Sequence, residues 1–319
     1  MFSFAKRNRE PGWLAVCPLK AHVEFAHVTR ESVDKPVLRR WLSAPLPAVT
    51  SAGIDPIQAC LDALVKPHEL KSFRCTTMPG VGDYQLIQIE APPVSDAEMK
   101  EALRWKLKDL IDIPADSAIF DILPIPDSGS ANRPRQLFLA VANRAALAPV
   151  VERFQSAELD LAAVDLPELA QRNIAELFED ENRGLAFLAF GDSSALLTFT
   201  YRGELFAFRR IEIGSELFAQ ATPERRLQLA ERVVLEMQRS MDTVDRQFSA
   251  ISLSQMIVAL PPESGLEEQF RNVLYLPFTL MDLGSVMDLS AFPELADPEA
   301  QRRALLTIGA ALRTTEVAA

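Results

Sequence analysis

Apolar positions between residues 184 and 214 fall into three short runs, which two turn signals separate. The first run, residues 185–190, is apolar throughout, and the turns lie at residues 191–194 and 202–204. Short runs of this kind joined by tight turns are typical of two consecutive β-hairpins. Because the first run has no polar position, we expect it to be buried on both faces, near the middle of a sheet.

The same pattern recurs in weaker form near the N-terminus. Residues 13–16 and 21–28 are mostly apolar and flank a break at residues 17–20, and a further run covers residues 35–41. Two hairpin-led halves predict a duplicated fold with a cleft between the halves.

The segments around these hairpins alternate between strand and helix periodicity, which indicates an α/β protein. Ser95 and Glu98 form a capping box that begins a helix. The side of that helix that we expect to be apolar carries Met99, Ala102, Leu103, Leu107, Leu110 and Ile111. We also predict strands at 69–77, 83–90, 118–123, 135–142, 159–165, 252–260 and 275–281, and helices at 55–66, 145–157, 167–178 and 265–274.

The longest predicted helix begins at Pro223, and apolar residues recur along it every three or four positions. A methionine-containing stripe at this spacing indicates core packing and not a cofactor site. The stripe consists of Leu227, Ala230, Val234, Met237, Met241, Val244 and Phe248.

Composition narrows the class of protein. The chain has 319 residues, enough for two domains, and its net charge of −11 argues against nucleic acid as a partner and against attraction to an anionic membrane. No apolar run reaches bilayer length, and the N-terminus lacks the apolar segment of a secretion signal, so we expect a cytosolic protein without a membrane span. Three scattered cysteines, Cys17, Cys60 and Cys75, suit a reducing compartment.

Several short motifs occur in a fixed order along the chain. They are Arg104-Trp105, Ile113-Pro114, Asp121, Arg210-Ile211, Ile213-Gly214, and the runs 236–240 and 308–313. Taken in this order, they resemble the PilM family of type IV pilus assembly proteins. Within that family, the chain is most similar to MshI, the PilM-like member of the MSHA pilus machinery.

The resemblance implies an α/β fold of the actin-like ATPase type, a duplicated ribonuclease H-like fold with two lobes and a central cleft. The first lobe would cover residues 1–178, with an inserted subdomain at about 91–142, and the second lobe residues 184–297. The charged run 179–183 would separate the lobes, and residues 298–319 would form a helix that packs back on the first lobe.

The resemblance also implies a binding protein of the pilus assembly platform. Such a protein docks the cytoplasmic N-terminal tail of an inner-membrane PilN-like protein and connects the pilus assembly motor to the envelope complex. Trp105, Ile113 and Pro114 are the candidate docking residues, because a tryptophan on an amphipathic helix is a plausible peptide anchor. Core packing is an equally good explanation of Trp105.

Both turns that would bind phosphate in an actin-like site depart from its pattern. Such turns usually provide an aspartate for magnesium and a glycine that lets backbone amides approach phosphate. In the first turn Cys17 replaces the aspartate and Pro18 removes an amide, and in the second Ala189 replaces the aspartate. Gly191, Asp192, Ser193 and Ser194 stay candidates for phosphate or a cation, although an ordinary hairpin turn is the preferred interpretation.

The segment expected to contact adenosine also departs from the pattern of an actin-like site, since two prolines and Glu263 lie where a Gly-Gly turn is usual. We therefore expect a pseudo-ATPase without a cofactor, and ATP with magnesium as the alternative. His22 and His27 are five positions apart on a predicted strand and so cannot share a metal. Two other hypotheses stay open: an active ATPase that uses Asp192 and Ser193 with magnesium, and a type II secretion platform component, which we would expect to continue beyond Ala319 into a membrane helix.

Overall fold

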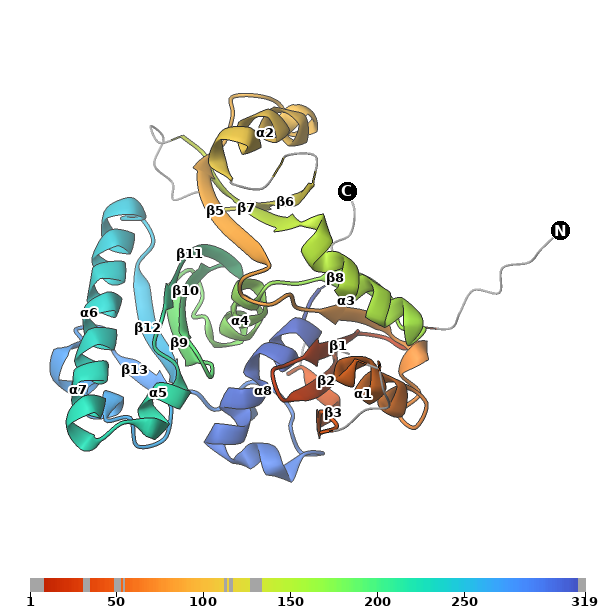
Figure 1. Cartoon of the computed structure of the whole chain (residues 1–319). Helices are drawn as coiled ribbons and strands as arrows, with labels where there is room; N and C mark the ends of the chain where they lie inside the picture. The colour runs from red at the N-terminus through yellow and green to blue at the C-terminus, as the bar shows by residue number, and fades with distance from the viewer. Residues whose placement is uncertain are drawn as a thin grey trace.

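The computed structural model describes residues 9–30, 35–48, 53, 55–111, 114, 117–126 and 134–314. It contains two five-stranded sheets with equivalent strand orders (Figure 1). The first sheet has the order β3 (Val37–Pro45), β2 (His22–Thr29), β1 (Trp13–Pro18), β4 (Arg74–Thr77) and β8 (Asp160–Val164). The second has the order β11 (Glu204–Ile211), β10 (Ala195–Tyr201), β9 (Gly184–Phe190), β12 (Leu253–Ala259) and β13 (Phe278–Leu280).

The pairing pattern is repeated as well. In each sheet the first three strands of the chain pair antiparallel as two hairpins, and the remaining two strands run parallel to the hairpins' first strand. This is the duplicated ribonuclease H-like fold of actin-like proteins, so the predicted fold class is confirmed. Strand β9 lies in the middle of its sheet and all of its residues are buried, as its uninterrupted apolar run predicted.

Helices and sheets form alternating layers. α1 (Pro56–Val65) and α3 (Arg144–Ser156) cover the outer face of the first sheet, while α6 (Pro223–Gln247) and α7 (Leu266–Val273) cover the outer face of the second (Figure 1). The layer shared by both sheets contains α4 (Pro167–Ala175) and α8 (Pro298–Ala311). α5 (Ser215–Gln220), which the sequence pattern did not indicate, follows β11, and short 3₁₀ turns occupy Leu70–Ser72, Glu176–Phe178, Leu283–Ser285 and Pro293–Ala296.

Strand periodicity explains how one strand serves two layers. Successive side chains of a strand point to opposite faces. Along β9, therefore, Leu185 and Phe187 join the shared layer, and Ala186 and Leu188 join the core beneath α6.

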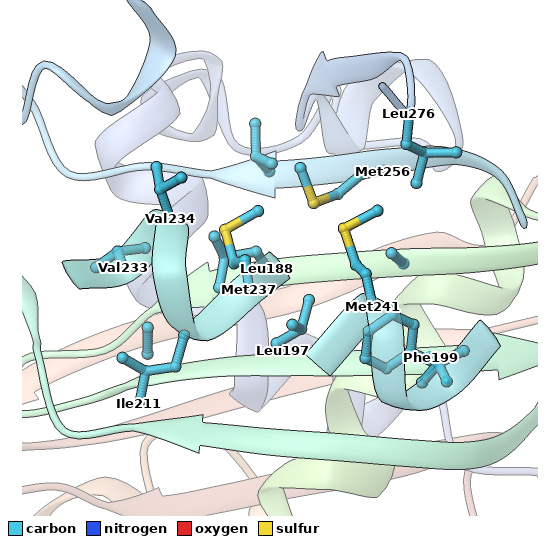
Figure 2. Close-up of a cluster of buried hydrophobic side chains, with 14 of the residues drawn as sticks. Leu188, Leu197, Phe199, Ile211, Val233, Val234, Met237, Met241, Met256 and Leu276 are labelled. Atoms are coloured by element: carbon cyan, nitrogen blue, oxygen red, sulfur yellow. The ribbon is translucent and has the colours of Figure 1, made fainter. Parts of the chain in front are cut away.

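Helix α6 packs its methionines directly over the second sheet. Figure 2 shows Met237 and Met241 of α6 close to Leu188, Leu197 and Met256 of the neighbouring strands. The predicted core stripe is confirmed from Ala230 onward, but the inclusion of Leu227 was wrong because that side chain is 49% exposed. The buried face runs instead through Leu229, Ala230, Val233, Val234, Met237, Met241 and Val244.

A third, smaller sheet projects from the two large ones. Its order is β5 (Tyr84–Glu90), β7 (Gln136–Asn143) and β6 (Ala118–Pro124), and α2 (Asp96–Leu110) covers one of its faces (Figure 1). The other face contacts the second lobe, where the rings of Phe138 and Phe208 lie 5.7 Å apart. β5 belongs to this sheet although it precedes residue 91, where we expected the insertion to begin.

The capping box of α2 is present, since Glu98 accepts hydrogen bonds from the backbone and hydroxyl of Ser95 at 3.3 and 2.7 Å. Met99, Leu103 and Leu107 are buried as predicted, but Leu110 is 41% exposed. Ile111, four residues after Leu107, packs against the cluster between α2 and the sheet, so Leu110 lies to the side of that contact. Among the described residues, no helix is both long enough and apolar enough to cross a bilayer.

The two helices of the shared layer cross in close contact at Gly309. A Cβ at this position would lie 2.1 Å from the carbonyl oxygen of Ala170, which is far inside van der Waals contact. The Asn173 side chain donates a 2.8 Å hydrogen bond to the Gly309 carbonyl, so α4 and α8 are joined at this point.

Candidate functional site

The two turns expected to bind nucleotide phosphates lie at the ends of the two N-terminal hairpins of the lobes. A backbone hydrogen bond closes each turn, from Leu19 to His22 at 2.8 Å and from Gly191 to Ser194 at 2.9 Å. The first turn reaches the second lobe through Lys20, whose Nζ lies 3.6 Å from Oε1 of Glu216 on α5.

The first turn begins with two residues that are poor ligands for a cation or for phosphate. Cys17 is 1% exposed, and burial raises the pKa of its thiol to about 12, so the thiol stays protonated at neutral pH. A protonated thiol is a poor metal ligand. Pro18 has no amide hydrogen to donate to phosphate.

The second turn uses its own backbone to hold α5. The carbonyl of Gly191 accepts from the Ser215 amide at 2.9 Å, and the carbonyl of Asp192 accepts from the Glu216 amide at 3.1 Å. Gly214 makes this approach possible, because a Cβ there would lie 2.1 Å from the Asp192 carbonyl oxygen. The first amides of α5 therefore have partners within the protein.

Gly191, Asp192 and Ser193 are exposed and Ser194 is half-buried, so the four predicted cofactor-binding residues share one surface turn. Among the described residues, no cluster of three or more His, Cys, Asp or Glu side chains could hold a metal ion. All three cysteines are free, and His27 is buried with its Nε2 2.8 Å from the Pro11 carbonyl.

Arg302 of α8 lies next to the second turn, and sequence reasoning did not identify it. Its side chain is 3% exposed, and its guanidinium donates to the carbonyl of Phe190 at the end of β9 and is 2.6 Å from Glu299 one turn earlier on the helix. The Glu-x-x-Arg spacing was visible in the sequence, but it indicates only a helix-surface pair. Only packing against the second sheet places this cation inside the shared layer.

The third nucleotide element, between β12 and α7, also lacks the expected geometry. Glu263 and Gly265 adopt left-handed backbone conformations with φ of 51° and 72°, and Glu263 is 3.4 Å from Arg226 of α6. Pro261 and Pro262 donate no amide hydrogens. The residues of these three turns do not form a ligand set that fits Mg-ATP.

The candidate docking residues are on the surface of α2 and the segment after it. Trp105 is 69% exposed, which excludes core packing as the explanation of this residue, and Pro114 is exposed as well. Ile113 lies outside the described residues.

A buried polar network joins the third sheet, α4 and the second lobe. The Tyr84 hydroxyl donates to Glu168 at 2.6 Å, and Arg210 donates to Glu168 at 2.6 Å and to the Tyr84 oxygen at 3.0 Å. Burial and the neighbouring Glu168 raise the pKa of Tyr84, so the phenol remains a donor. Arg210 belonged to the motifs noted above, but its two partners could not be inferred because they lie 126 and 42 positions away.

A second buried polar contact lies between the first sheet and α8. Glu24 of β2 is 2% exposed and accepts a hydrogen bond from the Thr307 hydroxyl of α8. Burial raises the pKa of the Glu24 carboxyl to about 7, and the Thr307 hydrogen bond opposes that rise.

No protein-family model matches the chain, and no curated protein sequence does. Among solved structures, the chain is similar to one in the PilM-PilN type IV pilus biogenesis complex, with a TM-score of 0.72 and 20% identity over 95% of this chain and 98% of that chain. It also matches the cytoplasmic domain of EpsL, an inner-membrane component of the type II secretion system of Vibrio cholerae, with a TM-score of 0.48 and 14% identity over 95% of this chain and 96% of that one. A third match is MreB5 of Spiroplasma citri bound to ADP, with a TM-score of 0.44 and 9% identity over 85% and 92% of the two chains. The first of these similarities shows a shared fold along nearly the whole of both chains.

Proposed function

We propose that this protein is a cytoplasmic scaffold of a type IV pilus assembly platform that docks the N-terminal tail of an inner-membrane PilN-like protein. The observation that carries the proposal is the fold shared with the chain in the PilM-PilN complex, over 95% of this chain at a TM-score of 0.72. The ordered motifs, from Arg104-Trp105 to residues 308–313, support the same family, and the MSHA pilus system is the finer assignment that we propose. The protein would reach the inner membrane, and the pilus assembly motor, through its partners.

The docking surface that we propose includes Trp105 and Pro114 on the third sheet's subdomain, with Ile113 between them in sequence. An indole that is 69% exposed on a helix provides a large apolar contact for a peptide. Tryptophan is enriched among the residues that contribute most to binding energy at protein interfaces.

Fluorescence polarisation with the labelled N-terminal tail of the PilN-like protein from the same organism tests the docking. We expect Trp105→Ala to weaken binding at least about tenfold, since truncating such an anchor typically costs about 2 kcal/mol. Tyr275→Ala is a matched control, because Tyr275 is an equally exposed aromatic residue, at 69%, in the second lobe. A tail that does not bind the unaltered protein would contradict the proposed function.

We also propose that the nucleotide site is degenerate and that the protein does not hydrolyse ATP. The protonated thiol of Cys17, the proline that follows it and the Glu263–Arg226 pair support this. Titration calorimetry with Mg-ATP is expected to show no binding heat. Micromolar binding that Asp192→Ala abolishes would instead establish the active-ATPase alternative.

A further inference from the structure

A groove on the second lobe lies between the end of β11 and the middle of α6. It is close to the second turn, because its lining residue Ile211 pairs with Ala195, which follows that turn. Its cavity has a volume of about 350 Å³, which falls within the usual range for ligand pockets. We call it the arginine groove, after the residues that dominate its lining: Arg209, Arg210, Arg232, Arg239 and, between the last two on α6, Leu235.

The charge of the arginine groove is opposite to that of the protein as a whole. Four arginines line it together with two acidic residues, Glu212 and Glu236, in a chain of net charge −11. Glu236 is shared by two arginines, at 2.8 Å from Arg209 and 3.2 Å from Arg239. Their charges are therefore only partly neutralised.

The other two arginines differ from each other. Arg210 is bound inward to the buried Glu168 at 2.6 Å. Arg232 is exposed and makes no ion pair with any of the described residues. It is therefore the arginine most available to an added carboxylate.

One wall of the groove is the end of an edge strand. β11 is an edge strand of the second sheet, and edge strands can accept a further strand. Ile211 and Ile213 are only 3% and 2% exposed, so they form the buried floor of the groove, beneath the arginine side chains. Leu235, which is 45% exposed, forms an apolar patch on the opposite wall.

We propose that the arginine groove binds an extended acidic peptide from a partner protein. Carboxylates of the peptide pair with Arg209, Arg232 and Arg239, an apolar side chain packs on Leu235, and the peptide backbone runs beside the end of β11. This site is independent of the docking surface at Trp105, and its test does not involve a PilN-like tail.

The probe is a short fluorescein-labelled peptide in which glutamate alternates with valine and threonine, titrated against the full chain by fluorescence anisotropy. We expect saturable binding, and we expect the double variant Arg232→Glu/Arg239→Glu to weaken it at least about tenfold, because two exposed ion pairs are lost and replaced by repulsion. The same variant should gain affinity for a peptide with lysine in place of every glutamate.

The matched control is Arg225→Glu/Arg246→Glu, which makes the same change in net charge on the same helix but outside the groove. Circular dichroism confirms that each variant is folded, and the control should bind the acidic peptide like the unaltered protein. Three outcomes would each overturn the proposal. The two double variants could lose affinity for the acidic peptide equally, or the unaltered protein could fail to bind it at millimolar concentration. Single-stranded DNA of matched charge could also compete for the groove as well as the peptide does.

Discussion

The two large sheets repeat one topology but bury different chemistry. Besides apolar residues, the second sheet buries uncharged threonines, Thr198 and Thr200. The first sheet buries ionisable groups, Glu24 and His27, on the same strand. One strand order therefore tolerates both kinds of interior, and the stability of the two lobes should respond differently to pH.

The largest effect that we expect comes from the apolar lobe. Phe206 is fully buried, and its ring centroid lies 4.9 Å from that of Phe248, so Phe206→Ala leaves a cavity. The free energy of unfolding should fall by about 3–5 kcal/mol. Urea denaturation should give the same loss at pH 5 and pH 8, because no titrating group is involved. If the loss of unfolding free energy depended on pH, the proposed difference between the two lobes would be wrong.

The first lobe should show the opposite behaviour at Glu24. The ordinary pKa of its carboxyl is 4.5, and burial raises it to about 7 in the folded protein. Between these values the folded state holds a proton that the unfolded state has lost, so the stability present below pH 4.5 is lost as the pH rises through about 7. The unfolding free energy lost over this pH range is about 3 kcal/mol, because each pKa unit of the shift corresponds to about 1.36 kcal/mol.

Glu24→Gln is the variant that isolates this effect, because glutamine keeps an acceptor for Thr307 but does not ionise. We expect the difference in unfolding free energy between the variant and the unaltered protein to change across this pH range and to be constant outside it. Parallel pH profiles for the two proteins would contradict the assignment of the buried proton to Glu24.

A smaller loss is expected where the lobes share a layer. Gly309→Ala places a Cβ against the Ala170 carbonyl, a backbone atom that cannot rotate away, and should cost about 1–3 kcal/mol through overpacking. Gly82→Ala is the matched control, because a Cβ there meets no atom within 4 Å. Thermal unfolding measures both. Equal melting temperatures for the two variants would show that α4 and α8 can separate without loss.

The smallest effect should be at the ion pair between Lys20 of the first turn and Glu216 of α5. Lys20 and Glu216 are 81% and 49% exposed, so their ion pair is screened by solvent. Lys20→Ala should lower the unfolding free energy by less than about 1 kcal/mol. The loss should decrease further in high salt, which urea denaturation at two salt concentrations would show. A large, salt-independent loss would mean that the turns hold the lobes together more strongly than this geometry indicates.

Local patterns predicted most of the fold. Three local patterns predicted their elements correctly, because each depends on neighbours within a few positions. They are the uninterrupted apolar run of β9, the capping box of α2 and the apolar stripe of α6. The inclusion of Leu227 and Leu110 was wrong because helical spacing indicates an apolar side of the helix but not which positions at its margin the neighbouring sheet covers. The short α5 had no periodicity long enough to detect.

Some features of the candidate site could likewise be predicted from the sequence, and others could not. The replacement of the two expected aspartates by Cys17 and Ala189 is a property of the sequence itself. Tertiary structure alone decided three other features. These are the partners of Arg210, the insertion of Arg302 into the shared layer, and the arginine groove formed by β11 and α6. Side-chain periodicity is a local property of the backbone, whereas burial and charge pairing depend on which distant segments the fold brings together.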